Sequence, residues 1–138
     1  MHAVIFEVWP RQERKAEYFD HAAALHGELE RMPGFISVER FESIAEPGKF
    51  LSLSFWDSDE AIARWRQDSR HRKVQAAGRA GIFADYRLRV AAVIRDYAMS
   101  EREQAPADSV AVHDTRPAAR HGSAIDSAID SSIDSSRQ

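Results

Sequence analysis

FISVERFESIAEPGKFLSLSFW, residues 35–56, decides the fold of this 138-residue chain. Apolar and polar residues alternate through 35–43 and again through 49–56, and this period of two is typical of a β-strand that lies against a core. Between the two runs, AEPG (45–48) combines proline and glycine, which are strong turn residues. The stretch therefore predicts two antiparallel strands that form a hairpin.

A strand and a helix are expected before this hairpin. The run AVIFEVW (3–9) is β-branched and aromatic, ends at Pro10, and predicts a strand. Residues 12–32 have helical spacing, and the breaker Pro33-Gly34 ends the helix. Its apolar side consists of Tyr18, Ala22, Leu25, Leu29 and Met32.

A second helix and a last strand are expected after it. Ser58 or Asp57 is a candidate N-cap, and acidic residues follow in the first turn, so a helix is predicted from about residue 59. Its buried side is marked by Ala61, Ile62 and Trp65. Residues 83–97, FADYRLRVAAVIRDY, alternate again and predict a long strand.

The order strand, helix, strand, strand, helix, strand is that of a ferredoxin-like βαββαβ sandwich. This α+β fold covers one face of an antiparallel sheet with helices. The fold class predicted from the order of elements is therefore a ferredoxin-like α+β sandwich.

The uncovered face of this sheet carries more apolar residues than a face in water needs. Val4, Phe6 and Val8 alternate with the equally apolar Ile5 and Trp9, and residues 50–56 show the same pattern. A sheet with one solvated face normally shows cleaner alternation. We therefore expect a homodimer in which two sheets pack face to face, as in a dimeric α+β barrel; a curved sheet under a wider helix layer is the alternative.

Composition divides the chain near Tyr97. Residues 1–97 form one expected domain, and residues 98–138 lack aromatic residues and are rich in Ala, Ser, Asp and Gln. The end, SAIDSAIDSSIDSSRQ, repeats every four residues with one isoleucine per unit, which is too little apolar surface to offset the entropy of ordering. We expect a disordered low-complexity tail; transient helix formation or docking on a partner remains the alternative.

Several classes of function are excluded. The chain has no cysteine, which removes disulfides and thiolate chemistry and is compatible with a cytoplasmic location. Residues 1–97 hold 15 basic and 15 acidic residues, so nucleic-acid binding is not expected. The first apolar run is far shorter than the roughly 20 residues of a membrane span, so no membrane partner is expected either. The sequence also lacks the His-rich spacing of a metal site and a glycine-rich phosphate loop.

HRKVQAAGR, residues 71–79, is the candidate functional motif. In a helix His71, Gln75 and Arg79 follow one another at intervals of four and share one stripe, with Arg72 one step aside. Residues 64–79 contain six basic residues against one acidic residue, and such a rim attracts anions. A solvated helix face is the plain alternative, because Arg and Gln are usually exposed.

Three passages together resemble the antibiotic biosynthesis monooxygenase family. They are SFWDSDEAIARW (54–65), HRKVQAAGR (71–79) and YRLRVAAVIRDY (86–97), and the likeness covers roughly residues 2–97. The resemblance implies a ferredoxin-like fold, a dimeric α+β barrel, and a pocket between sheet and helices in each subunit. Members of the family include cofactor-independent oxygenases of polycyclic phenols, quinol monooxygenases and heme-degrading oxygenases.

The heme-degrading members differ from this chain at two residues that heme degradation uses. They share Trp65, but the resemblance places their iron-ligating histidine where this sequence has Gln75, a poor heme ligand. They also use an asparagine on the first strand, where IFEVW offers Glu7. We therefore expect no cofactor, with heme as the less favoured possibility.

An oxygenase without a cofactor must hold an electron-rich aromatic substrate as its anion in a dry pocket. His71 is the expected general base, since its ordinary pKa lies near neutrality. Gln75 is expected to donate to a carbonyl or peroxide oxygen, and Arg79 or Arg72 to pair with a phenolate. The other expected substrate contacts are Trp65 with Phe55 or Tyr86, which stack on the ring, and His26.

The expected function is thus a monooxygenase of a small phenolic, quinol or polycyclic aromatic substrate, with dioxygen as second substrate. A non-catalytic dimeric protein that binds a small ligand or serves in a stress response is the alternative, because one histidine and a basic rim suit both.

Overall fold

Four antiparallel strands form the sheet on which the N-terminal unit, Met1–Ile94, is built. The structure is a computed structural model that describes residues 1–114, apart from the side chains of residues 69 and 70. The strands pair in the order β2-β3-β1-β4. Their bounds are β1 His2–Pro10, β2 Phe35–Glu42, β3 Phe50–Trp56 and β4 Phe83–Ala92.

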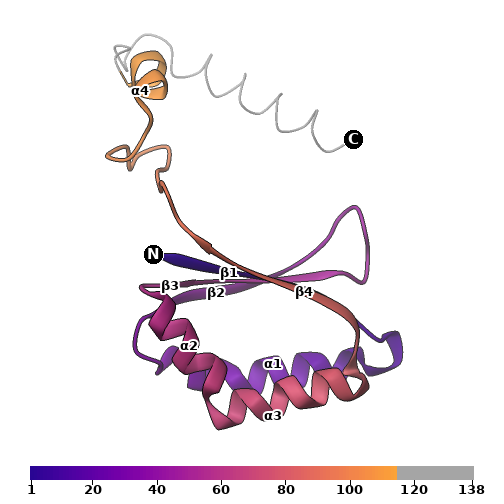
Figure 1. Ribbon diagram of the computed structural model, residues 1–138. Helices are drawn as coiled ribbons and strands as arrows, with labels where there is room; N and C mark the ends of the chain where they lie inside the picture. Colours follow the sequence, from indigo (N-terminus) through magenta and orange to yellow (C-terminus); the bar gives the residue numbers. More distant parts are fainter. Residues whose placement is uncertain (115–138) are drawn as a thin grey trace. The chain divides into compact units, whose positions relative to one another are not determined.

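Helices α1, α2 and α3 all lie on the same face of the sheet, as Figure 1 shows. Their bounds are α1 Lys15–Glu30, α2 Asp59–Gln67 and α3 Ser69–Ala77, and short helical turns flank them at Gln12–Arg14 and Gly78–Ile82. Helix layer and sheet together make a ferredoxin-like α+β sandwich. The fold class predicted from the order of elements is confirmed.

Strand register decides which side chains face the helices. Phe6 of β1 pairs with Ser52 of β3 and with Leu88 of β4, and all three belong to the helix-covered face. One residue along, Ile5 pairs with Leu53 and Arg89, and this row belongs to the open face. Because side chains alternate along a strand, the whole set of outward residues follows from this register.

The second helical region differs from the expectation of one helix from about residue 59. Ser58 caps α2 as expected, its hydroxyl accepting a hydrogen bond from the Ala61 amide at 3.1 Å. Asp68 then has extended geometry, with ψ of 134°, which ends α2 before α3 begins. The resulting corner turns α3 into a second wall, and it places the 71–79 motif on a helix of its own.

Strand β4 is shorter than the expected 83–97. It ends at Ala92, which pairs with His2, the first residue of β1. Beyond that point only the Val93 amide continues the ladder, donating to the Met1 carbonyl at 2.9 Å. The backbone N–H and C=O groups of a strand need hydrogen-bond partners, and β1 offers no further partners beyond this point.

Two buried clusters join the helices to the sheet. One contains Val8, Tyr18, Phe50 and Ile82, and the other contains Leu29, Trp56, Ala61 and Ile62. Both combine residues of β1 or β3 with residues of the helical layer. They hold the helices against the sheet at two places.

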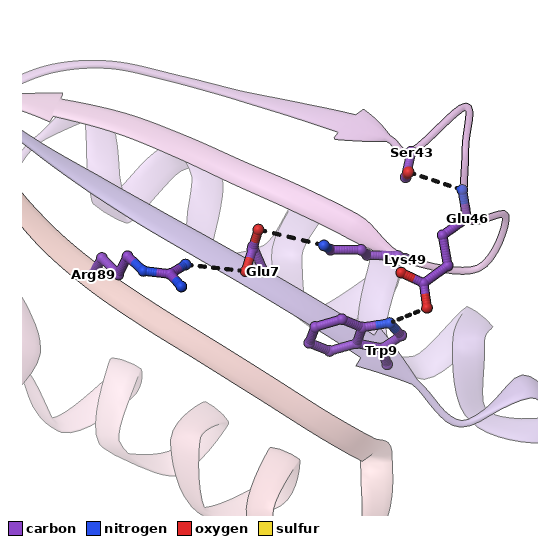
Figure 2. A network of polar contacts seen from close by, with 6 residues as sticks. All are labelled: Glu7, Trp9, Ser43, Glu46, Lys49 and Arg89. Carbon is purple, nitrogen blue, oxygen red and sulfur yellow. Dashed lines mark hydrogen bonds and ion pairs between the residues drawn. The ribbon is translucent and has the colours of Figure 1, made fainter.

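The open face of the sheet carries a polar network as well as apolar residues. Glu7 lies between two cations: its carboxylate is 3.4 Å from Lys49 Nζ and 3.2 Å from Arg89 Nη1 (Figure 2). Beside it, the Trp9 indole donates to the Glu46 carboxylate at 3.2 Å. The apolar part of this face comprises Ile5, Leu51, Leu53, Phe55 and Phe41.

The C-terminal unit begins at Arg95 and contains a short helix, α4 Ala107–His113. Its polar centre is Arg102, which donates to the Asp114 carboxylate at 3.0 Å and to the Ser109 hydroxyl at 2.8 Å. We expected no regular structure after residue 97, and α4 corrects that expectation. The apolar content of this segment does not predict a helix, but the side-chain contacts of Arg102 link its two ends. The four-residue repeat lies outside the described residues. Within the described part of the chain, no helix has the length and apolar character needed to span a membrane.

Gly34 is the glycine that the packing of α2 requires. Its φ of +86° is left-handed, and a Cβ there would lie 2.6 Å from the Cβ of Ala61, which is fully buried. Gly48 has a similar φ of +91° but open space around it.

We predict that Gly34→Ala lowers the free energy of unfolding by about 3 kcal/mol, since backbone strain and overpacking add. Gly48→Ala, the matched control, should cost about 1 kcal/mol from backbone strain alone. Urea unfolding of both variants measures the difference. Equal losses would show that the approach of α2 to Gly34 is not a close one.

Candidate functional site

A cavity of about 530 Å³ lies between the helix-covered face of the sheet and helices α1, α2 and α3. Its floor is formed by inward residues of all four strands, and its walls by the three helices and the turn that follows α3. Most lining residues are apolar or aromatic. The strand residues of the lining are Val4, Phe6, Val38, Arg40, Ser52, Ser54, Trp56, Phe83, Tyr86, Leu88 and Val90.

Six of the eight predicted site residues line this cavity. Trp65 comes from α2, Tyr86 from β4, and the remaining four from α3 and the turn after it: His71, Arg72, Gln75 and Arg79. The spacing of four in the motif therefore places its stripe along a cavity wall. Whether these residues act in a reaction stays a prediction.

Phe55 does not line the cavity. It pairs with Ala3 of β1 and belongs to the open face, whereas its neighbours Ser54 and Trp56 face the helices. Both faces of β3 are apolar, so the alternation of the sequence did not reveal which residues the helices cover. The register, fixed by the buried Trp56, corrects the assignment.

His26 lies outside the cavity as well, contrary to expectation, and His21 takes its place in the lining. His26 is exposed and pairs with Glu30, its Nε2 lying 3.0 Å from the carboxylate. At about 100° per residue, His21 lies about 60° from Tyr18 around the helix and His26 about 80° on the other side. The helical wheel thus contained the signal for His21, since the inner stripe is centred on Tyr18.

The imidazole of His71 stacks on the indole of Trp65. The ring centroids are 4.5 Å apart and the planes are inclined by 16°. Trp65 in turn lies 6.4 Å from the ring of Trp56, which is only 1% exposed. A buried residue of the sheet therefore positions the histidine through one intervening aromatic ring.

Nδ1 of His71 has two neighbours with opposite requirements. The Trp65 carbonyl oxygen lies at 3.2 Å and accepts a hydrogen bond, whereas the Gln75 amide nitrogen lies at 3.0 Å and donates one. If Nδ1 carries the proton, it donates to Trp65 and leaves Nε2 with a free lone pair. If Nδ1 accepts from Gln75, the proton is on Nε2 and the ring is a donor there.

Gln75 is positioned by further contacts around the α2–α3 corner. Its amide nitrogen also reaches the Arg66 carbonyl at 3.4 Å, and its oxygen accepts from Arg72 Nη1 at 3.4 Å. Both contacts are long and therefore weak. Gln75 can thus turn its amide, so the tautomer of His71 is free to respond to a ligand.

Arg79 forms the far end of the stripe. Its Nη1 donates to the Tyr86 hydroxyl at 2.8 Å, which joins the turn after α3 to β4. Tyr86 is 39% exposed, so this pair lies at an accessible border of the cavity. A guanidinium there keeps further N–H groups for an anion.

The surroundings of His71 favour its neutral form. Burial lowers its pKa below the ordinary value, and the positive charge of Arg72 acts in the same direction. The hydrogen bond to the Trp65 carbonyl and the charge of Asp68 oppose this shift without cancelling it. A neutral imidazole is the form that can accept a proton.

Arg40, Tyr18 and Ser52 line the cavity too, although the sequence patterns did not mark them as site residues. Arg40 extends from β2, and its charge opposes the rise that burial causes in the pKa of Tyr18, while Ser52 is its cross-strand neighbour on β3. In FISVERFES, Arg40 has the same parity as Val38, but the sequence alone does not show which parity faces inward. Among residues 1–114, no group of three or more metal-ligating side chains is found.

Fold and cavity together define a ferredoxin-like α+β sandwich with an apolar chamber under its helices. The sequence profile of the family described as "Antibiotic biosynthesis monooxygenase" matches residues 1–77. The chain belongs to the antibiotic biosynthesis monooxygenase family.

Relatives and solved structures agree with this membership. The chain is 42% identical over 93 residues to the "Jasmonate monooxygenase ABM" of Pyricularia oryzae, a match that covers 67% of this chain but only 43% of that protein. Rv0793 of Mycobacterium tuberculosis matches with a TM-score of 0.64 and 18% identity, over 70% of this chain and 98% of that one. A variant of SnoaB from Streptomyces nogalater, a cofactor-independent oxygenase, matches with a TM-score of 0.60 and 14% identity, over 69% and 94% of the two chains. At these identities the two structures show the fold alone.

We predict that Gln75→Glu raises the pKa of His71 by about one pH unit, because a carboxylate beside Nδ1 stabilises the imidazolium. NMR titration of the histidine side chains measures this shift. Gln67→Glu is the control, since residue 67 is exposed at the end of α2 and outside the lining. An unchanged or lower pKa in Gln75→Glu would show that the side chain of residue 75 does not lie beside Nδ1 of His71.

Proposed function

We propose that the protein is a cofactor-independent monooxygenase that acts on a small phenolic, quinol or polycyclic aromatic substrate with dioxygen. The observation that carries the proposal is the neutral His71, stacked on Trp65 in the wall of an apolar cavity. A base of this kind in a largely dry chamber suits the removal of a proton from an acidic C–H or phenolic O–H group.

In this proposal the substrate supplies the electrons. His71 Nε2 accepts a proton from the bound substrate, and the resulting anion reduces dioxygen. In the oxidation of a ring CH₂ to a carbonyl, one oxygen atom enters the substrate and the other leaves as water with the two hydrogens, so no external reductant is required. Gln75 and Arg72 lie beside the histidine, where they can stabilise negative charge on oxygen.

The comparisons support the reaction class in two ways. The relative from Pyricularia oryzae is named a monooxygenase of jasmonate, and SnoaB is described as a cofactor-independent oxygenase. The matched part of this chain spans less than half of the first of these proteins, so the transfer of its activity is part of the proposal.

We propose further that the protein is a cytoplasmic homodimer in which two sheets pack through their open faces. On this face of the described sheet the apolar side chains of Ile5, Leu51, Leu53 and Phe55 lie opposite the helix layer. These four side chains are half-buried, and an apolar patch on an uncovered sheet face marks an interaction surface. Leu88 and Val90 of β4 are exposed, at 51% and 45%, although they line the cavity.

A binding protein without catalytic activity is the second candidate. The cavity, the basic side chains and the single neutral histidine would serve a transported or sensed anion equally well. Heme is less favoured, because Gln75, a poor iron ligand, stands where the family resemblance places the iron-ligating histidine.

Oxygen consumption with a panel of hydroquinones and anthrone-type phenols tests the enzymatic function. We expect turnover by the wild type and a loss of about 100-fold in kcat/KM for His71→Ala, the size typical of a missing general base. His26→Ala is the matched control, since His26 is exposed and outside the cavity lining, and should be unchanged. Absence of turnover with every compound would refute the oxygenase, full activity of His71→Ala would refute the base, and a Soret shift with hemin would favour the heme alternative.

Sedimentation tests the dimer. We predict that the wild type sediments as a dimer at micromolar concentration and that Leu53→Asp yields the 15.6 kDa monomer, because a carboxylate would be buried between two apolar faces. Ile44→Asp, at a position 91% exposed between β2 and β3, should leave the dimer intact. A monomeric wild type would refute this interface.

A further inference from the structure

Arg40 is a cation built into the floor of the cavity. It stands on β2, one edge strand of the sheet, and lines the cavity with Tyr18 and His21 of α1. The motif residues belong to α3, and Arg79 contacts Tyr86 of β4, the other edge strand. The cavity thus has basic groups at both edges of the sheet.

The guanidinium of Arg40 lacks a carboxylate partner. Within residues 1–114 it takes part in no ion pair, and its Nε is buried without a hydrogen-bond acceptor. The Tyr18 hydroxyl lines the cavity with it, and the guanidinium has five N–H groups to donate. A buried donor without an acceptor costs stability, so retention of arginine at an inward strand position needs a reason.

Strand register gives the distance between β2 and β4, the two edge strands of the cavity floor. Arg40, Ser52, Phe6 and Leu88 form one continuous row across β2, β3, β1 and β4. Three strand spacings separate the edge strands by about 14 Å. Between them the floor consists of Phe6 and the small Ser52, which leaves space for a ligand beside Arg40.

We propose that Arg40, with the hydroxyl groups of Tyr18 and Ser52, binds the carboxylate of a substrate whose oxidisable ring lies near His71. The inference rests on the proposed function for the ring end, but the anion site stands on its own contacts. A carboxylate would accept the free N–H groups of Arg40 in a bidentate pair and the hydroxyl of Ser52 as a third donor. The substrate is accordingly a ring compound with a carboxylate on a short arm, rather than a neutral polycycle.

The selectivity that follows is for an acid over its ester. Methylation removes the charge and the bidentate geometry and leaves the apolar contacts of the ring unchanged. Charge-assisted hydrogen bonds of this kind account for about tenfold or more in affinity. The wild type should therefore discriminate between two ligands that differ by one methyl group.

The test uses 2,5-dihydroxyphenylacetate and its methyl ester, a quinol pair that belongs to the proposed substrate class. Anaerobic calorimetry measures binding without oxidation, and aerobic oxygen uptake with the same pair measures turnover. We expect the wild type to bind the acid at least tenfold more tightly than the ester. Arg40→Gln should bind both equally, with its affinity for the ester within twofold of the wild type.

Two further variants separate charge from fold. Arg64→Gln makes the same change at an exposed position of α2 outside the cavity lining and should retain the preference. Arg40→Lys keeps the charge but loses the planar fork, and should retain a preference of a few fold. If thermal melting shows that Arg40→Gln is unfolded, Arg40→Lys and Ser52→Ala carry the test, each with a reduced preference for the acid.

The outcomes distinguish the two proposals. A preference for the acid that Arg40→Gln abolishes, without oxygen uptake from this pair, supports the anion site and counts against the oxygenase, which absence of turnover across the full panel would refute. Equal binding of acid and ester by the wild type, no binding of either, or an undiminished preference in every Arg40 and Ser52 variant overturns the anion site, whatever the turnover.

Discussion

The packing of Trp65 between Trp56 and His71 is the contact on which the candidate site depends. Trp56 is buried in the sheet, its indole nitrogen donating to the Ser54 hydroxyl at 2.9 Å, so its ring cannot rotate freely. Trp65 lies against it from α2, and His71 stacks on Trp65 from α3. Three separate elements are thus aligned by one series of rings, and an error in the seating of Trp56 would move the histidine.

The corner at Asp68 makes this series possible. A straight helix through residues 59–77 would carry His71 past Trp65 along one axis, and the two rings would not face each other. The extended backbone at Asp68 folds α3 back, and the Trp65 carbonyl, which accepts from the Asp68 amide at 3.1 Å, also lies 3.2 Å from His71 Nδ1. The break that ends α2 therefore supplies the acceptor that orients the imidazole.

An open chamber inside a small domain has an energetic cost, which the two buried clusters offset. Unfilled volume forfeits dispersion contacts on every side. Here the floor contains Ser52 and Ser54 at inward positions where larger residues would fill the space, while Phe50 and Trp56 on the same strand are buried. The large side chains at the ends of β3 pack into the core, whereas the small serines in its middle leave open space. Side-chain size along β3 therefore determines where the cavity lies.

The order of elements could be predicted because each signal was local: alternation in 35–56, the breaker after Met32, and the Ser58 cap. The inner face of the sheet could not, since Phe55 and Trp56 are equally apolar and only long-range packing decides which one the helices cover. The motif of 71–79 was found because helical spacing is local too. Arg40 was missed because a charged residue on a strand is ordinarily expected to face water, and only the structure shows its inward position.

The charges around the cavity explain why a neutral histidine suits an anionic ligand. Burial and the charge of Arg72 both disfavour the imidazolium, so His71 is a weak but available base. An anion bound beside Arg72 would compensate part of this positive field and raise the proton affinity of His71. By linkage, proton uptake by the imidazole then strengthens the hold on the anion to the same degree. Base and ligand site thus reinforce each other: the histidine is a stronger base with the ligand bound than it is without it.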